Sequence, residues 1–158
     1  MSPLRKGLLL AALQMLIVSS LGAQLLYDRA HLPRVWVRSA PYDPDLPIRG
    51  RYLSLQLVVD FDKTFSREYN MTMARLVIEG TRLRAIEDPK GHNGVEKMRL
   101  PVWTLVEPVT FFIPEHADDP SRVKPGETLW VECSIPKRGP PRPIRLGIRR
   151  GAGAIEPL

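Results

Sequence analysis

The chain has 158 residues, of which 44% are hydrophobic, 25% charged and 7% aromatic. This length suits one domain with an appendage and is short for two full domains. The single cysteine excludes an internal disulfide framework and any zinc or iron–sulfur site that needs several cysteines. The net charge of +6 favours acidic partners such as anionic lipid, but it does not identify one.

A long uncharged segment lies close to the N-terminus. Residues 7–26 carry no formal charge, and they follow Arg5 and Lys6. About 20 residues, each rising about 1.5 Å, cover a hydrocarbon core of about 30 Å. The sequence therefore predicts a cytoplasmic N-terminus over residues 1–6 and a transmembrane anchor over residues 7–27.

Two other interpretations of this segment stay open. It is either a signal peptide cleaved after small residues such as Ser20 and Gly22, or a buried helix of a soluble protein. We favour the uncleaved anchor, because its apolar length exceeds the about 7–15 residues of a signal-peptide core. A long domain after the first helix is translocated largely regardless of its charge. We therefore expect a single-pass protein of the inner (cytoplasmic) membrane with a periplasmic C-terminal domain.

After the anchor, the sequence predicts a proline-containing linker over residues 28–48, a β-rich extracytoplasmic domain over residues 49–150 and a flexible tail over residues 151–158. The clearest strand covers residues 51–59, where Leu53, Leu55, Leu57 and Val59 alternate with other side chains. Period-two alternation is typical of a half-buried strand.

Further short β-like runs are separated by Pro and Gly. Strands are predicted at residues 35–37, 75–79, 82–86, 95–100, 109–113, 128–135 and 143–149. Gly80, Asn93–Gly94 and Pro125–Gly126 are predicted turns, and residues 66–74 are the one helical candidate outside the anchor. The spacing predicts a mainly β fold, an antiparallel β-sandwich or small β-barrel after a single transmembrane helix.

One short motif contains Asp43, Pro44, Arg49, Gly50, Tyr52 and Leu55, and a later element contains Pro114 and Glu115. On these residues the chain resembles the GDYXXLXY family of bacterial membrane-anchored proteins, and the resemblance spans nearly the whole chain. Two signature positions differ, because Arg51 stands where the family has Asp and Leu57 where it has a second Tyr. The chain is thus similar to a divergent member.

The resemblance implies an anchor with an extracytoplasmic β-rich domain, and the family has no established activity. Its members look like companions of multi-spanning membrane proteins. We therefore expect a non-enzymatic accessory or binding protein whose partners are the lipid bilayer and an integral membrane protein, with no nucleic acid partner. A secreted binding domain after signal cleavage is one alternative.

No residue of the sequence is assigned to catalysis, to a metal or to a cofactor. The densest group of polar candidates is Glu115, His116, Asp118 and Asp119, which would serve a membrane-tethered hydrolase as the other alternative. It lacks the six or more oxygens and the turn glycines of a calcium loop, so an acidic surface loop is the simpler interpretation.

Two further features are expected to be structural. Cys133 alternates with Val131 and Ile135, which predicts a small buried side chain and not a nucleophile. The basic residues from Lys137 to Arg150 are interpreted as charges that keep a terminal edge strand soluble, with a membrane-facing patch as the alternative.

Overall fold

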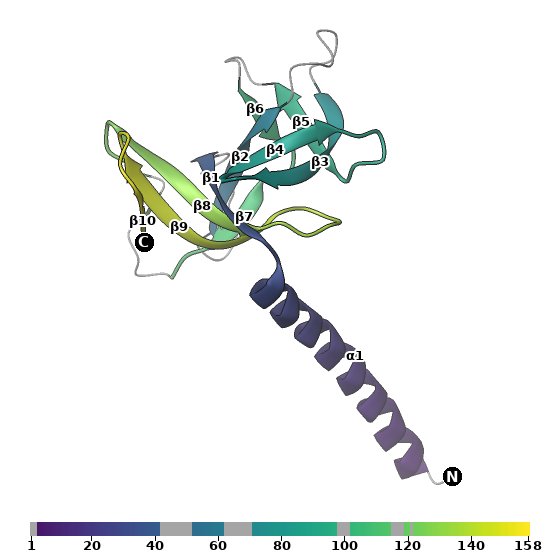
Figure 1. The fold of residues 1–158 in the computed structure, drawn as a ribbon. Helices are drawn as coiled ribbons and strands as arrows, with labels where there is room; N and C mark the ends of the chain where they lie inside the picture. The colour runs from purple at the N-terminus through teal and green to yellow at the C-terminus, as the bar shows by residue number, and fades with distance from the viewer. Residues whose placement is uncertain (1–2, 42–51, 62–70, 98–101, 115–118, 121) are drawn as a thin grey trace. The chain divides into compact units, whose positions relative to one another are not determined.

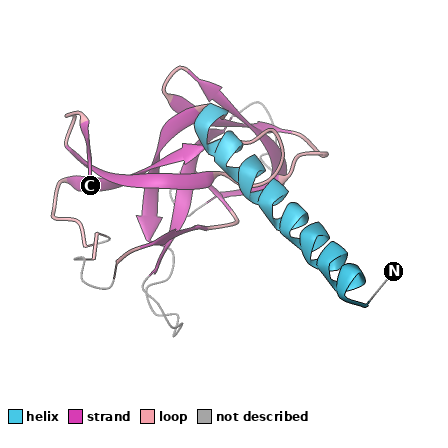
Figure 2. Ribbon diagram, turned by 90° about the horizontal axis from the view of Figure 1, so that it is seen from below, coloured by secondary structure: helices cyan, strands magenta, loops and turns pink. Residues whose placement is uncertain are grey.

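A computed structural model describes residues 3–41, 52–61, 71–97, 102–114, 119–120 and 122–158. The chain divides into two compact units, residues 1–32 and residues 33–158. The elements are α1 (Pro3–His31), β1 (Arg34–Pro41), β2 (Tyr52–Phe61), β3 (Met71–Glu79), β4 (Arg82–Glu87), β5 (Asn93–Lys97), β6 (Trp103–Leu105), β7 (Val109–Phe112), β8 (Glu127–Ser134), β9 (Arg142–Arg150) and β10 (Ile155–Pro157). Among the described residues, α1 is the one helix and every other element is a strand (Figure 2).

The first unit is the long helix α1, which has 29 residues and buries none of them. At about 1.5 Å per residue it extends about 43 Å, more than the hydrocarbon core of a bilayer requires. It is long and apolar enough to cross a membrane or to act as a signal sequence. Because none of its residues is buried, it does not resemble the core helix of a soluble domain.

The second unit is a mainly β domain with a closed five-stranded barrel and additional strands (Figure 1). The barrel runs β2-β4-β3-β5-β6 and closes because β6 pairs with β2 through Val58↔Thr104 and Val59↔Trp103. The predicted β fold is confirmed, in its barrel form. Its strand pairs are antiparallel except β2–β4, which is parallel through Asp60↔Arg84 and Phe61↔Ala85.

The strand β2 belongs to both parts of the domain. Its second half closes the barrel, whereas its first half pairs with β7 and with β1. The strand β1 then continues into a sheet in the order β1-β8-β9-β10. The leucines that alternate along this strand are predicted to face one side of it. In the structure Leu55 and Leu57 are fully buried and Val59 is nearly so, which places this strand in the core of both parts.

The β domain has a core of buried apolar side chains. It contains these buried side chains: Val35, Val37, Leu55, Leu57, Val59, Phe61, Ala74, Leu83, Ala85, Val95, Leu105, Val109, Leu129, Val131, Cys133, Ile135 and Leu146. The prediction that Cys133 is a buried small side chain is confirmed, and burial raises the pKa of its thiol to about 12.

Two of the predicted turns are confirmed. The strands β3 and β4 form a hairpin around Gly80, which has a positive φ of 61°. Gly126 has a φ of 86°, and the Glu127 N–H donates to the Lys124 carbonyl oxygen at 2.9 Å, as a type II turn requires.

The predicted turn at Asn93–Gly94 is wrong, because both residues pair with β3 inside β5. The chain reverses earlier, where the Gly91 N–H donates to the Asp88 carbonyl oxygen at 2.7 Å. A side chain at Gly91 would lie 2.5 Å from the backbone of Ala74, so a glycine is required there.

Three other boundaries differ from the prediction. Residues 71–74 of the predicted helix form the start of β3, and residues 66–70 lie outside the described residues. Of the predicted linker, residues 28–31 belong to α1 and residues 34–41 form β1. The predicted flexible tail contains β10, which pairs with β9 and covers an edge that we had expected to be terminal.

Candidate functional site

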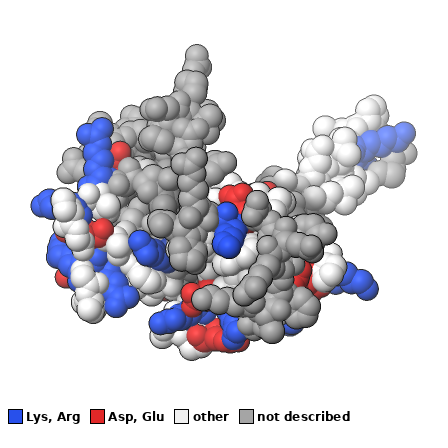
Figure 3. Space-filling view, turned by 90° about the horizontal axis from the view of Figure 1, so that it is seen from above, with Lys and Arg blue, Asp and Glu red and all other residues white. Residues whose placement is uncertain are grey.

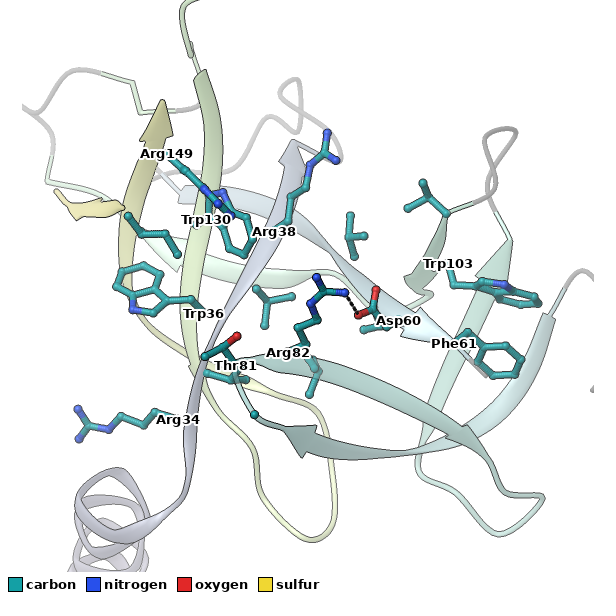
Figure 4. A pocket seen from close by; sticks show the side chains of 18 residues that line it. Arg34, Trp36, Arg38, Asp60, Phe61, Thr81, Arg82, Trp103, Trp130 and Arg149 are labelled. Carbon is teal, nitrogen blue, oxygen red and sulfur yellow. Dashed lines mark hydrogen bonds and ion pairs between the residues drawn. The ribbon is translucent and has the colours of Figure 1, made fainter. Parts of the chain in front are cut away.

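A groove of about 940 Å³ crosses the β domain. It is lined by Arg34, Val35, Trp36, Val37, Arg38, Val58, Val59, Asp60, Phe61, Gly80, Thr81, Arg82, Leu83, Val102, Trp103, Trp130, Arg149 and Ile155. The lining includes all 3 tryptophans of the sequence, together with four arginines. We call this the tryptophan–arginine groove (Figure 4).

The strand β1 supplies the middle of the groove through simple alternation. Val35 and Val37 are buried, so the side chains between and beside them project from the opposite face of the strand. Arg34, Trp36 and Arg38 therefore share the face that borders the groove.

The indole of Trp36 is held between neighbours on β8, β9 and β10. It lies in register with Glu132, whose carboxylate accepts a hydrogen bond from the Arg145 Nε at 2.7 Å. The Arg145 guanidinium lies 5.3 Å from the centroid of the Trp36 ring, within cation–π range. A Cβ at Gly147 would lie 2.9 Å from this ring, so the position needs glycine.

Trp130 is held in a similar way one row further along the sheet. Its Nε1–H donates to the Thr128 Oγ1 at 2.9 Å, which fixes the ring. The Arg149 guanidinium lies 5.5 Å from the ring centroid, and its Nε donates to the Gly153 carbonyl oxygen at 2.9 Å. Arg38 is in register with Trp130 on β1, so arginines flank the indole from two strands (Figure 4).

The far wall of the groove comes from the barrel. Arg82, in β4, lies 3.5 Å from the Asp60 carboxylate of β2. Beyond them the rings of Phe61 and Trp103 pack with centroids 4.3 Å apart (Figure 4). The groove thus places an arginine–aspartate pair between two aromatic regions.

The groove has an excess of positive charge. Four arginines line it against one carboxylate, that of Asp60. Elsewhere on the domain, basic and acidic side chains lie next to each other. Figure 3 shows such a mixture at its left, which is the side where Figure 1 draws β8, β9 and β10. There Arg150 pairs with Glu127 at 2.9 Å and with Glu156 at 2.7 Å.

The chemistry of the groove suits binding. Tryptophan and arginine offer broad apolar faces and N–H donors that match carboxylates or phosphates. Within the described residues, the lining contains no histidine, cysteine or serine, and no group of three or more His, Cys, Asp or Glu side chains is placed to hold a metal.

Among the residues singled out from the sequence, those that the structure describes do not line the groove. Leu55 is fully buried in β2. Tyr52, another signature residue, is half-buried at the start of the same strand and lies in register with Phe112 of β7. Pro114 follows β7 and is exposed. The following positions lie outside the described residues: Asp43, Pro44, Arg49, Gly50, Arg51, Glu115, His116 and Asp118. Leu57, at the second signature tyrosine, is a fully buried core residue.

The groove residues were missed because they come from strands far apart in the chain. One local signal was available. The run from Arg34 to Arg38 alternates large polar or aromatic side chains with valines, which predicts an exposed face bearing arginine, tryptophan and arginine.

Comparison with protein-family models, with curated proteins and with solved structures gives no match to this chain. The helix α1 and the tryptophan–arginine groove are therefore the features from which a function is inferred.

Proposed function

We propose that this chain is a non-enzymatic membrane-anchored envelope protein whose β domain binds an integral membrane protein. The observation that carries the proposal is α1, which is long and apolar enough to cross a bilayer and has no buried residue. In water such a helix would expose a large apolar surface, and insertion into lipid removes that cost.

The location follows from this anchor. Arg5 and Lys6 precede the apolar segment and favour a cytoplasmic N-terminus, which would leave the β domain in the periplasm. The resemblance to the GDYXXLXY family supports the same layout, and we propose that the chain is a divergent member.

Binding, and not catalysis, is supported by what lines the groove. Tryptophans and arginines, which are enriched in the energetic centres of protein interfaces, line it together with apolar side chains and one aspartate. An accessory protein that holds a membrane partner needs such a surface and does not need a nucleophile.

Cell fractionation with affinity purification tests the proposal. The full-length tagged protein should stay with membranes after salt washing, should be released by detergent and should co-purify with an integral membrane protein. Replacing residues 7–26 with an unrelated anchor should leave this association intact, since the β domain makes the contact.

The outcomes separate the alternatives. An aqueous full-length protein would contradict the anchor, and N-terminal sequencing that begins after Gly22 would show a cleaved signal peptide and a secreted domain. Association lost on the anchor swap would place the contact in α1.

A further inference from the structure

We propose that the tryptophan–arginine groove binds an acidic polypeptide segment of the membrane partner. Carboxylates of that segment pair with Arg38 and Arg149, and its apolar side chains cover Trp36 and Trp130. This inference rests on the proposed function, because it names the chemistry of the partner and the surface that receives it.

Charge complementarity is the first argument. Of the four arginines in the groove, Arg82 lies 3.5 Å from the Asp60 carboxylate and Arg34 has a partner of its own, which leaves Arg38 and Arg149 to meet a ligand. Arg38 is exposed and, within the described residues, has no hydrogen-bond or ion-pair partner. An unpaired guanidinium beside half-buried rings gains most from a carboxylate, which it binds through two parallel N–H bonds.

Preorganisation is the second argument. The Arg149 guanidinium is fixed by the Gly153 carbonyl oxygen on one side and the Trp130 ring on the other. This hydrogen bond uses the Arg149 Nε, so the outer N–H groups stay available for a ligand. Because the side chain is already ordered, binding costs less conformational entropy.

The distribution of these groups favours an extended ligand. Arginines and tryptophans alternate across β1, β8 and β9 and then continue to Arg82 and Trp103 on the barrel. A single anionic headgroup needs one cluster of cations. A polypeptide segment with carboxylates and apolar side chains meets the whole row, and tryptophan and arginine are enriched among residues that dominate protein interfaces.

The tryptophans provide the measurement. All 3 line the groove, so the intrinsic fluorescence of the full-length protein in detergent reports on occupancy without a label. The probe is a synthetic peptide that alternates glutamate with leucine. We expect a saturable change in emission that weakens with added salt, and no change with a peptide in which lysine replaces glutamate.

Charge reversal locates the binding. Arg38→Glu should weaken peptide binding about tenfold or more, since one charge-assisted contact is replaced by repulsion. Arg149→Gln is the second variant and should weaken it less. The matched control is Arg138→Glu, an exposed arginine in the β8–β9 connection outside the groove, which should bind as the parent does.

The results separate this inference from the proposed function. No saturable peptide binding, or equal binding by Arg38→Glu, overturns the groove assignment. A response to phosphatidylglycerol vesicles in place of the peptide overturns it in favour of lipid. If the partner co-purifies with the Arg38→Glu variant as with the parent, the proposed function stands and this inference fails. Both the proposed function and this inference are supported if Arg38→Glu loses the partner, Arg138→Glu keeps it, and Arg38→Glu retains the circular dichroism spectrum of the parent.

Discussion

Side chains alternate between two faces both in the strands of the barrel and in β1, β8 and β9, but the alternation has different results in the two regions. Inside the barrel, β2, β5 and β6 contribute Val59, Val95 and Leu105, which are at most 3% exposed. On the outer face, the positions between buried residues hold Trp36 and Arg38. The comparison shows that one strand pattern builds both the stability of this domain and its groove.

The two regions also differ in how their side chains are held. Val59, Val95 and Leu105 belong to the packed apolar core, whereas Trp36 and Trp130 are fixed by cation–π contacts, a hydrogen bond and a glycine that makes room for a ring. Substitutions in the barrel should therefore change stability most, and substitutions in the groove should change binding more than stability.

The largest effect is expected inside the barrel. Leu105→Ala removes a buried side chain and leaves a cavity, so we expect a loss of about 2–5 kcal/mol in the free energy of unfolding, measured by denaturant titration. Leu158→Ala is the matched control, because that leucine is 64% exposed. Its effect should stay within about 0.5 kcal/mol, and equal losses in the two variants would contradict the assigned core.

A smaller loss of stability is expected at Gly147, which lies against the Trp36 ring. In Gly147→Ala, the new Cβ would lie 2.8 Å from the Ile155 Cγ2 and 2.9 Å from the Trp36 ring. We expect a loss of about 1–3 kcal/mol from overpacking, with a shift in tryptophan emission because the ring must move.

The double variant Gly147→Ala with Ile155→Ala provides the control for that effect. Removing the isoleucine methyl groups relieves one of the close contacts, so the two substitutions should be less damaging together than their sum. Strict additivity would show that the Ile155 contact plays no part.

The alternation in β2 made the strand and its apolar core positions Leu55, Leu57 and Val59 predictable from sequence. The burial of Ser54 and Gln56 on the other face did not follow from that alternation, which predicts a half-buried strand. The same rule applied to residues 34–38 would have revealed the aromatic and basic face of β1. What the sequence could not supply was the approach of Trp130, Arg149 and Trp103, which depends on strand pairing between distant segments.

The errors have physical causes of the same kind. Asn93–Gly94 has the composition of a tight turn, but Asp88 accepts from the backbone N–H of Lys90 at 2.9 Å and begins the reversal earlier. The C-terminal residues look featureless, yet Ile155 starts a strand on β9 because Gly147 leaves space for its side chain. Local composition marks where a turn is allowed, and tertiary pairing decides which one forms.

The thiol of Cys133 extends the comparison to pH. Its folded pKa is raised from 9.0 to about 12 by burial, so the folded state keeps its proton where the unfolded chain loses it. The contribution to stability is complete below pH 9.0 and is lost as pH rises toward 12. Between these values we expect a loss of about 1.4 kcal/mol per pH unit relative to Cys133→Ala.

Thermal or denaturant unfolding of the parent and of Cys133→Ala from pH 8 to pH 11 measures this difference in stability. Lysines and tyrosines are the same in the two proteins, so their effects cancel in the comparison. Iodoacetamide at pH 8 should leave the native thiol unmodified and should react after unfolding. Rapid alkylation of the folded protein would show that the interior is open at β8.

The smallest effect is expected at the ion pair between Arg150, which is exposed, and Glu127, which is half-buried. The Arg150 Nε and the Lys124 backbone N–H donate to the Glu127 carboxylate and hold its pKa below 4.5. A lowered folded pKa means that this contribution is present above pH 4.5 and disappears as pH falls through the folded value.

Glu127→Gln should reduce the difference between the melting temperatures at pH 7 and pH 3. Because water and salt screen an exposed pair, the change should be far smaller than that of Leu105→Ala and should shrink at high salt. Arg150 retains Glu156 at 2.7 Å, so β9 and β10 should stay paired in the variant and peptide binding to the groove should be unchanged. A large loss of stability in Glu127→Gln would instead mean that the outer sheet, like the barrel, depends on a buried contact at this edge.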